Sequence, residues 1–358
     1  MPFVFSVALW LAYVITTHSV IVTAPVRIAD LGGWTDTWFS GHGAVCHLAV
    51  RPGVEVRLSA RRMRDGPGVV VDARDFGERF DLPDGGTFAS RHRLLAAAID
   101  SASRARDQAY HLQVTSGVPP GASMGTSAAV VVAVLAAFDA IAGTALSRVH
   151  LARRAHGVEV QSLGQESGIQ DQIAAAYGGA NFIEMPSYPE AVVEPLSLTP
   201  ETCQALDARL LLVYLGQAHD SSAVHREVIA ALATSGAARR QVLEGLRTLA
   251  REGRAALLAG DLAAYGAALS ANCGMQAALH PALISDVAAQ VIAEARAHGA
   301  AGWKVNGAGG DGGSVTVLCG AGAGARDHLA PAIEKQVRAV RVLDLQLSPT
   351  GVDVGIPT

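Results

Sequence analysis

The sequence predicts an α+β protein built from two domains. The chain has 358 residues, more than a single hydrophobic core usually holds. Half of the residues are hydrophobic and 17% are charged, which is typical of a globular chain with ample core material. Short β-branched runs dominate residues 20–80, whereas Ala- and Leu-rich helical stretches dominate residues 221–299.

The first part of the chain is predicted to be rich in strands. Short β-branched runs, separated by Gly, Pro and Asp, predict strands at 20–28, 43–50, 54–62 and 68–75. The pattern then predicts, in order, a helix at 91–101, a strand at 110–116, helices at 127–142 and 147–163, and a strand at 178–185.

The second part, after Pro186, is predicted to be richer in helix. A strand at 207–216 is followed by helical stretches at 221–234, 237–258, 261–273 and 281–299. A strand, a glycine loop and a second strand follow within 302–320, and a last run at 338–348 closes the pattern. We therefore expect a hinge near 186–205, with domains at 19–190 and 191–358.

Residues 1–18 form an apolar extension before the first strand. No charged residue occurs before Arg27, but the strand leaves at most 18 residues, fewer than the ~20 that a membrane-spanning helix needs. A signal peptide would carry a positive n-region and a cleavage site, which are absent. A non-native extension or upstream start codon, an anchor, and a packed extra helix remain open. We expect no membrane association.

Charge and cysteine content argue against two further classes of protein. The net charge is −4 and no Lys/Arg-rich tract occurs, so no nucleic-acid partner is expected. The four cysteines are scattered, without the spacing of a zinc site. We expect them to be reduced thiols in a cytoplasmic protein.

The stretch PPGASMGTSAAVVVAVLAAF, residues 119–138, places small residues where a buried helix begins. Glycines let the backbone approach a phosphate, and the N–H groups of a helix N-terminus favour an anion. No Walker A lysine is present. A capped core helix explains the same residues equally well. The candidate phosphate-binding residues are Pro120, Gly121, Ser123, Met124, Gly125, Thr126 and Ser127.

Three other segments carry candidate site residues. Five glycines within 307–313 exceed what a hairpin needs, which indicates close approach to a ligand or to another loop. Arg27 lies in an apolar strand and needs an anionic partner. Glu159 and Asp171 are two carboxylates that would suit Mg²⁺ coordination and general-base work near a phosphate loop. A solvated helix face for Glu159 and a helix cap for Asp171 are the structural alternatives.

Together the four segments resemble the GHMP kinase superfamily, which includes galactokinase, homoserine kinase, mevalonate kinase and kinases of fucose and heptose phosphates. Its Ala-Pro-x-Arg strand and Gly-x-x-Thr-Asp turn are matched by APVRIADLGGWTDT at 24–37. Its Pro-x-Gly-x-Gly-Leu-Gly-Ser-Ser-Ala motif is matched at 119–128, with Ser123 in place of one glycine. Its Gly-Ala-Gly-x-Gly-Gly motif is matched by GAGGDGG at 307–313, with one residue inserted or shifted.

The resemblance implies a two-lobed GHMP kinase fold with the active site in the cleft between the lobes. The loop at 121–127 would wrap the ATP phosphates, braced by the loop that contains Gly307 and Gly309. Ser127 and Glu159 would hold Mg²⁺. Asp171, with Arg27 beside it, would accept the proton of the acceptor hydroxyl. The candidate sugar-binding residues are Gly33, Trp34, Thr35 and Asp36.

The GGWTDT and GIQDQIAAAYGG segments resemble fucokinases and heptose 7-phosphate kinases more than mevalonate kinases. Galactokinases carry Glu-His at the position of Gly33-Trp34, which argues against galactose. The resemblance implies an ATP-dependent kinase, monomeric or homodimeric, of the anomeric C1 hydroxyl of a monosaccharide or sugar phosphate. The alternatives are a kinase of a non-sugar alcohol such as a cyclitol, and a non-catalytic sensor of ATP and sugar. Two residues depart from the family pattern. Ser123 stands where the motif has a glycine, and Asp30 stands where an apolar residue is expected.

Overall fold

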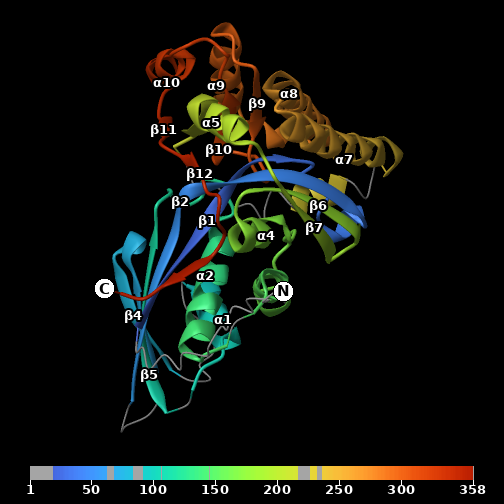
Figure 1. Cartoon of the computed structure of the whole chain (residues 1–358). Helices are drawn as coiled ribbons and strands as arrows, with labels where there is room; N and C mark the ends of the chain where they lie inside the picture. The colour runs from blue at the N-terminus through green and yellow to red at the C-terminus, as the bar shows by residue number, and fades with distance from the viewer. Residues whose placement is uncertain are drawn as a thin grey trace, which may run out of the picture.

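The computed structural model describes residues 19–62, 68–83, 92–105, 107–144, 146–216, 226–231 and 236–357. These residues form two β-sheets with helices packed against them, so the predicted α+β class is confirmed (Figure 1). The expectations for residues 1–18 and for much of the helix at 221–234 lie outside the described residues. Across the described ranges, no helix is long and apolar enough to cross a membrane.

The larger sheet has nine strands. They are β1 (Ser19–Leu31), β2 (Gly43–Arg62), β3 (Gly68–Ala73), β4 (Glu78–Pro83), β5 (Gln108–Ser116), β6 (Ala180–Ser187), β7 (Glu190–Leu196), β12 (Gln346–Leu347) and β13 (Asp353–Gly355). The main path is β13-β1-β2-β5-β3-β4, and β6, β7 and β12 join through β2 and β6. The two strands predicted at 43–50 and 54–62 are one continuous strand, β2. Strands β4, β7 and β13 were not predicted.

An irregularity near the end of β1 shapes the site. The register between β1 and β2 shifts between Ile28 and Leu31, and Ala29 has a positive φ of 55°. In a regular strand Arg27 and Asp30, three residues apart, would point to opposite faces. Because the bulge changes this alternation, both side chains reach the same cavity.

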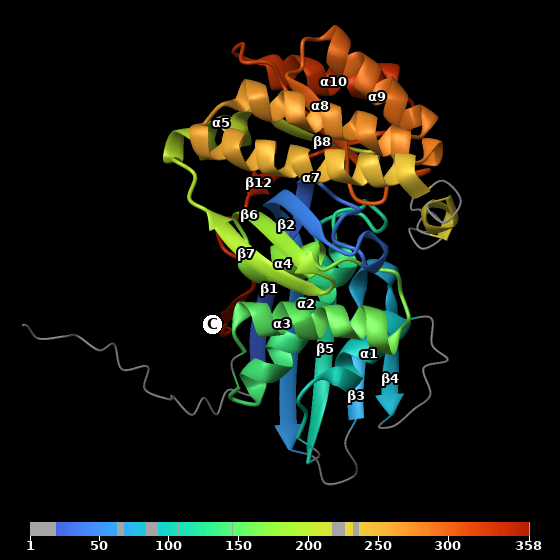
Figure 2. The same ribbon diagram turned by 90° about the vertical axis from the view of Figure 1, so that its right-hand side faces the viewer.

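Four helices pack beside the larger sheet (Figure 2). They are α1 (Arg93–Ser101), α2 (Thr126–Ile141), α3 (Arg148–Gly157) and α4 (Gln170–Tyr177). Helix α2 contacts β1 and β2 and is buried over most of its length, as its apolar sequence predicts. The helix predicted at 147–163 changes after α3 into a π-helical turn, Val158–Ser162, which carries Glu159.

The smaller sheet has the order β11-β8-β10-β9. Its strands are β8 (Leu210–Tyr214), β9 (Gly302–Val305), β10 (Ser314–Leu318) and β11 (Arg341–Leu343). The helices of this part of the chain are α5 (Pro200–Arg209), α7 (Gly236–Ala259), α8 (Leu262–Leu279), α9 (Asp286–Ala297) and α10 (Ala325–Gln336). Among them α8, α9 and α10 contact strands of the smaller sheet, whereas α7 packs on α8 and on β1, β2 and β6 of the larger sheet. The helix predicted at 281–299 begins as a 3-10 turn at Pro281–Leu283. Helices α5 and α10 were not predicted, and α10 contains Pro331, which is unusual within a helix.

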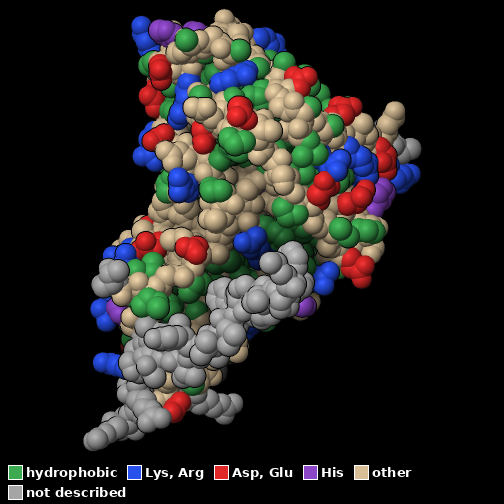
Figure 3. All heavy atoms as spheres, viewed as in Figure 1, with side chains coloured by type: hydrophobic (Ala, Val, Ile, Leu, Met, Phe, Trp, Pro, Cys, Tyr) green, Lys and Arg blue, Asp and Glu red, His purple; other side chains and the backbone are tan. Residues whose placement is uncertain are grey.

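The two sheets are joined by a shared core. Leu31 of β1 lies in one hydrophobic cluster with Ala250 of α7 and Tyr265 of α8. The C-terminal strands β12 and β13 return to the larger sheet, where they pair with β2 and β1. The domain boundary at 190/191 stays a prediction. On the face shown in Figure 3, acidic and basic side chains lie interspersed.

Candidate active site

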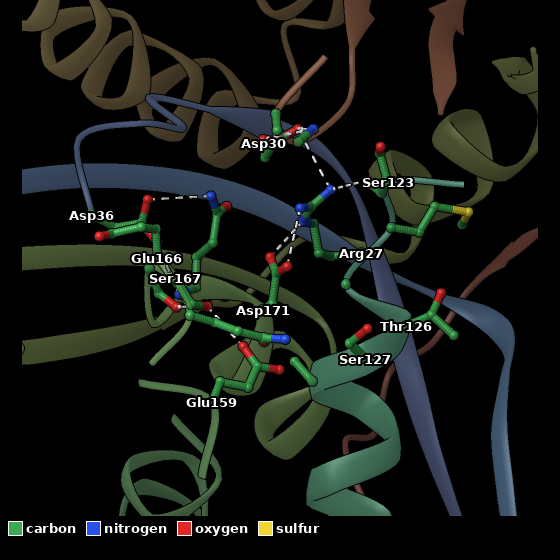
Figure 4. A pocket seen from close by; sticks show the side chains of 18 of the residues that line it. Arg27, Asp30, Asp36, Ser123, Thr126, Ser127, Glu159, Glu166, Ser167 and Asp171 are labelled. Carbon is green, nitrogen blue, oxygen red and sulfur yellow. Dashed lines mark hydrogen bonds and ion pairs between the residues drawn. The ribbon is translucent and has the colours of Figure 1, made fainter. Parts of the chain in front are cut away.

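Residues from four distant segments line one cavity of about 370 Å³ (Figure 4). The segments are the end of β1 with the following turn, the loop before α2, the stretch from Glu159 to Asp171, and the start of the glycine loop after β9. The predicted site residues in its wall are Arg27, Trp34, Asp36, Gly121, Ser123, Met124, Gly125, Thr126, Ser127, Glu159, Asp171 and Gly307. The tertiary structure therefore brings together most of the residues singled out by sequence.

The loop before α2 has the backbone of an anion-binding loop. Gly121, Ser123 and Gly125 all have positive φ, of 72°, 57° and 72°. Positive φ is uncommon for a residue other than glycine, and Ser123 adopts it while its carbonyl accepts a hydrogen bond from Arg27 Nη1. No side-chain cap bond satisfies the start of α2, and the Thr126 hydroxyl is buried without a partner among the described residues. These groups fit an anion with several oxygens.

Arg27 and Asp171 form an ion pair at the centre of the cavity. Arg27 Nε donates to Asp171 Oδ1 at 2.8 Å, and Nη2 donates to Oδ2 at 3.2 Å. Burial alone would lower the pKa of Arg27, but the carboxylates of Asp171 and Asp30 raise it above its usual value. The Asp171 side chain keeps 26% of its surface exposed, so a ligand can reach it. A Cβ at Gly125 would lie 2.9 Å from Asp171 Cγ, which explains the glycine there.

Glu159 is a buried carboxylate whose hydrogen bonds are incomplete. Its Oε2 accepts from Ser167 Oγ at 2.8 Å and from Gln172 Nε2 at 2.9 Å, while Oε1 has no partner among the described residues. Burial raises its pKa to about 7, with the charge of Asp171 adding to the effect. Ser127, at the start of α2, lines the same cavity (Figure 4). An uncompensated carboxylate oxygen beside a hydroxyl fits a divalent cation.

The side-chain oxygens available near Glu159 indicate which cation would fit. No group of three or more His, Cys, Asp or Glu side chains within the described ranges could hold a metal by itself. Mg²⁺ commonly takes one or two carboxylates and completes its shell with water and substrate phosphates. The Glu159 and Ser127 oxygens fit that mode.

The turn after β1 supplies the opposite end of the cavity. Asp36 Oδ2 accepts from the backbone N–H of Gln170 at 3.1 Å, and Oδ1 from Gln170 Nε2 at 3.4 Å. Burial raises the pKa of Asp36 to about 6. A Cβ at Gly168 would lie 2.0 Å from Asp36 Oδ2, so only glycine fits beside this carboxylate. Trp34 also lines this part.

Four of the predicted residues lie outside the cavity wall. Thr35 is fully buried, and its hydroxyl donates to the carbonyls of Gly32 and Ala44 at 2.7 and 3.1 Å. Thr35 therefore holds the turn together, and it has no hydrogen left to donate to a sugar. Gly33 packs against Asp30, and a Cβ there would lie 2.6 Å from Asp30 Oδ2. Pro120 and Gly309 likewise do not face the cavity.

The glycine loop after β9 packs against the loop before α2. Ser314 Oγ, at the start of β10, donates to the carbonyl of Ala122 at 2.6 Å. A Cβ at Gly307 would lie 3.0 Å from both the Ser123 carbonyl and Arg27 Nη2. Gly309 packs against the Leu283 carbonyl instead. The two glycine loops thus brace each other, as the resemblance implies.

The partners of Asp30 were not predicted from the sequence. Asp30 and Lys304 of β9 are both fully buried, with Lys304 Nζ 3.4 Å from Asp30 Oδ1. Both Asp30 oxygens also accept from the Gly307 N–H at 3.2 Å, and Arg27 Nη1 lies 4.0 Å from Oδ1. Burial would raise the pKa of Asp30, but Lys304 and Arg27 hold it below its usual value. A lone lysine in the apolar run GWKV was the available signal.

Several cavity-lining residues that precede Asp171 were also not predicted. They are Gln165, Glu166, Ser167, Gly168 and Gln170. The polar run GQESGIQ between two helices was the signal, but only the fold shows that this run lines the cavity.

Parts of the chain are similar in sequence to known proteins. Residues 93–179 match the family described as GHMP kinases N terminal domain. The D-glycero-alpha-D-manno-heptose 7-phosphate kinase of Campylobacter jejuni is 34% identical over 105 residues, which are 29% of this chain and 31% of that protein. The bifunctional fucokinase/GDP-fucose pyrophosphorylase of Arabidopsis thaliana is 24% identical over 82% of this chain and 29% of that protein. These two relatives are thus matched over less than a third of their length.

Two further likenesses cover most of both chains. The mevalonate kinase of Thermococcus gammatolerans is 26% identical over 82% of this chain and 83% of that protein. The crystal structure of a D-glycero-D-manno-heptose 1-phosphate kinase from Bacteroides thetaiotaomicron superposes with a TM-score of 0.71 at 20% identity, over 94% of this chain and 98% of that one. Residues 93–179 are thus similar to the N-terminal domain of GHMP kinases, and most of the chain shares its fold with the solved D-glycero-D-manno-heptose 1-phosphate kinase.

Proposed function

We propose that this protein is an ATP-dependent kinase that phosphorylates a hydroxyl of a sugar, with the anomeric C1 hydroxyl as the preferred acceptor. The observation that carries the proposal is the Arg27–Asp171 pair, which opens into the same cavity as the small-residue loop before α2 and the buried Glu159. The similarity to sugar and sugar-phosphate kinases supports the acceptor class.

ATP would bind with its phosphates against residues 121–127. The loop lines the cavity with three residues of positive φ, and the uncapped start of α2 would offer N–H groups to phosphate oxygens. Glu159 and Ser127 would hold Mg²⁺, which neutralises charge on the phosphates during transfer. The partial charge of Glu159 near neutral pH would become a full negative charge beside a cation.

Asp171 would accept the proton of the acceptor hydroxyl or orient that hydroxyl for attack. Its two hydrogen bonds from Arg27 hold the carboxylate in one orientation for this task. Arg27 also lies next to the Ser123 carbonyl, so its charge would act on the transferred phosphoryl group. Asp36 would accept hydrogen bonds from other sugar hydroxyls. We infer a cytoplasmic enzyme with a small-molecule acceptor.

The first experiment measures ADP release with Mg·ATP and a panel of acceptors: L-fucose, heptose 7-phosphate, galactose, arabinose, cyclitols and mevalonate. Turnover with a sugar supports the proposal. Turnover with mevalonate or a cyclitol alone favours a non-sugar alcohol kinase, and binding of ATP and sugar without turnover favours a sensor.

The second experiment replaces Asp171 by Asn on the accepted substrate. Asp171→Asn should keep ATP and sugar affinity but lower kcat by about 10²–10⁴-fold, because the amide cannot accept the proton. Asp286→Asn is the matched control, since Asp286 also lies in the first turn of a helix, α9, away from the cavity. A near-normal kcat for Asp171→Asn would remove this residue from the mechanism.

A further inference from the structure

A second cavity, of about 350 Å³, adjoins the candidate active site. It is lined by Arg93, Leu163, Gly164, Gln165, Glu166 and Arg226. Gln165 and Glu166 line both cavities, so the two meet at the loop that leads to Asp171. In Figure 4, Glu166 and Ser167 lie on the same side of the site as Asp36, away from Thr126 and Ser127. The second cavity thus extends from the Asp36 side of the candidate active site, where the acceptor would bind.

The charged groups of this second cavity are mostly basic. Two exposed arginines, Arg93 and Arg226, and one carboxylate, Glu166, line this cavity. The Glu166 carboxylate already accepts a hydrogen bond from the Trp38 indole. Neither arginine forms an ion pair with any residue of the described ranges. The cavity therefore holds more positive charge than its own residues neutralise.

Both arginines are carried by anchored elements. Arg93 is the first residue of α1, whose residues Leu95 to Ile99 are buried. Arg226 begins the helical stretch 226–231, in which Val228 is fully buried in one cluster with Trp34 and Leu246. The same cluster thus links the helix of Arg226 to the tryptophan that lines the candidate active site.

We propose that the second cavity binds a phosphate group carried by the acceptor, remote from the hydroxyl that is phosphorylated. The acceptor would then be a phosphorylated sugar rather than a neutral monosaccharide. Arginine guanidinium groups bind phosphate oxygens through charge-assisted, often bidentate hydrogen bonds. A sugar held between Asp36 and Asp171 would point its remote end past Glu166 toward the arginines. This inference rests on the proposed kinase function.

The test compares neutral and phosphorylated forms of the same sugars. Mannose and mannose 6-phosphate, and galactose and galactose 6-phosphate, are titrated into the full chain by calorimetry without ATP, and then assayed for ADP release with Mg·ATP. We expect the phosphorylated member of at least one pair to bind at least tenfold more tightly. Arg93→Gln and Arg226→Gln should each weaken that binding about tenfold and leave binding of the neutral sugar unchanged.

Arg153→Gln is the matched control, because Arg153 is an exposed arginine of α3 that lines neither cavity. A titration with inorganic phosphate measures the affinity of the anion site without a contribution from the sugar. Equal affinity for both members of every pair, or a preference that survives the double Arg93→Gln/Arg226→Gln variant, overturns the inference. Turnover of neutral sugars without preference would leave the kinase function standing. Arginine-dependent binding of phosphorylated sugars without any turnover would support the anion site and overturn the kinase function.

Discussion

Two buried carboxylates in the wall of the same cavity have opposite surroundings. Asp30 is fully buried and contacts Lys304, Arg27 and the Gly307 N–H. Glu159 is 5% exposed, receives hydrogen bonds only from the neutral groups of Ser167 and Gln172, and has one oxygen without a partner among the described residues. The pKa of Asp30 is held below its usual value, whereas burial raises the pKa of Glu159 to about 7.

This difference indicates that the two carboxylates have different tasks: Asp30 stabilises the fold, whereas we propose that Glu159 binds a cation. Asp30 connects β1 to β9 and to the glycine loop, and the protein itself supplies the opposite charges. Glu159 is buried with only neutral donors from the described residues, which is costly for a carboxylate, and we propose that a bound cation offsets this cost. Removing the cation beside Asp30 should therefore lower the stability of the fold, whereas removing the charge of Glu159 should not.

The largest expected effect is that of Lys304→Met. The substitution leaves the buried Asp30 with only Arg27, at 4.0 Å, as a cation, and should lower the free energy of unfolding by about 3–5 kcal/mol. This variant and Glu159→Gln are compared with the wild type by urea denaturation at pH 8. Glu159→Gln should leave the free energy of unfolding unchanged or raise it. Equal losses in both variants would remove the distinction between the two carboxylates. The Asp30→Asn/Lys304→Met double variant should recover part of the loss.

The pH dependence of stability provides the second test. The pKa of Glu159 is raised in the folded state from 4.5 to about 7, so its carboxylate destabilises the fold increasingly as pH rises from 4.5 to 7. The free energy of unfolding of the wild type, relative to that of Glu159→Gln, should therefore decrease by about 3 kcal/mol as pH rises over that window. Asp30, whose pKa is lowered below 3.8, loses its contribution only at lower pH and adds no slope there. A flat difference between pH 4.5 and 7 would contradict the assignment of Glu159.

Ser127→Ala tests whether the Glu159 side of the cavity binds a cation. The variant removes one oxygen from the proposed Mg²⁺ site, and should weaken Mg·ATP binding about tenfold and lower kcat while leaving sugar binding unchanged. No side-chain cap bond exists at this helix start, so loss of a cap does not confuse the result. Calorimetric titration of Mg·ATP and sugar into the folded variant is the measurement. Unchanged nucleotide affinity and rate would mean that Ser127 only begins a core helix.

The smallest effect is expected at Thr35. Thr35→Val removes a hydroxyl whose bonds stay within the turn, and should cost about 1 kcal/mol of stability by urea denaturation. The KM for the acceptor should be unchanged, because Thr35 does not line the cavity. A large rise in KM with normal stability would return Thr35 to the sugar site.

Local patterns allowed much of the fold to be predicted. The β-branched runs predicted the cores of β1, β2, β3 and β5, and the apolar run after the small-residue loop predicted α2 within a residue at each end. Helix α5 was missed because SLTPET reads as a hinge, although Thr199 caps the helix and Pro200 starts it. Helix α10 was missed because Pro331 interrupts its pattern.

The sequence by itself determined which residues are candidates for the chemistry, because glycine clusters, a lone strand arginine and paired carboxylates leave local signatures. Those signatures, with the family resemblance, led to Arg27, Glu159 and Asp171. Only the tertiary structure decided how each charge is compensated. Lys304 and Asp30 are 274 positions apart, and the bulge at Ala29 turns Asp30 toward Lys304. Since the pKa of a buried carboxylate depends on the charges that the fold places around it, chain position alone could not distinguish Asp30 from Glu159.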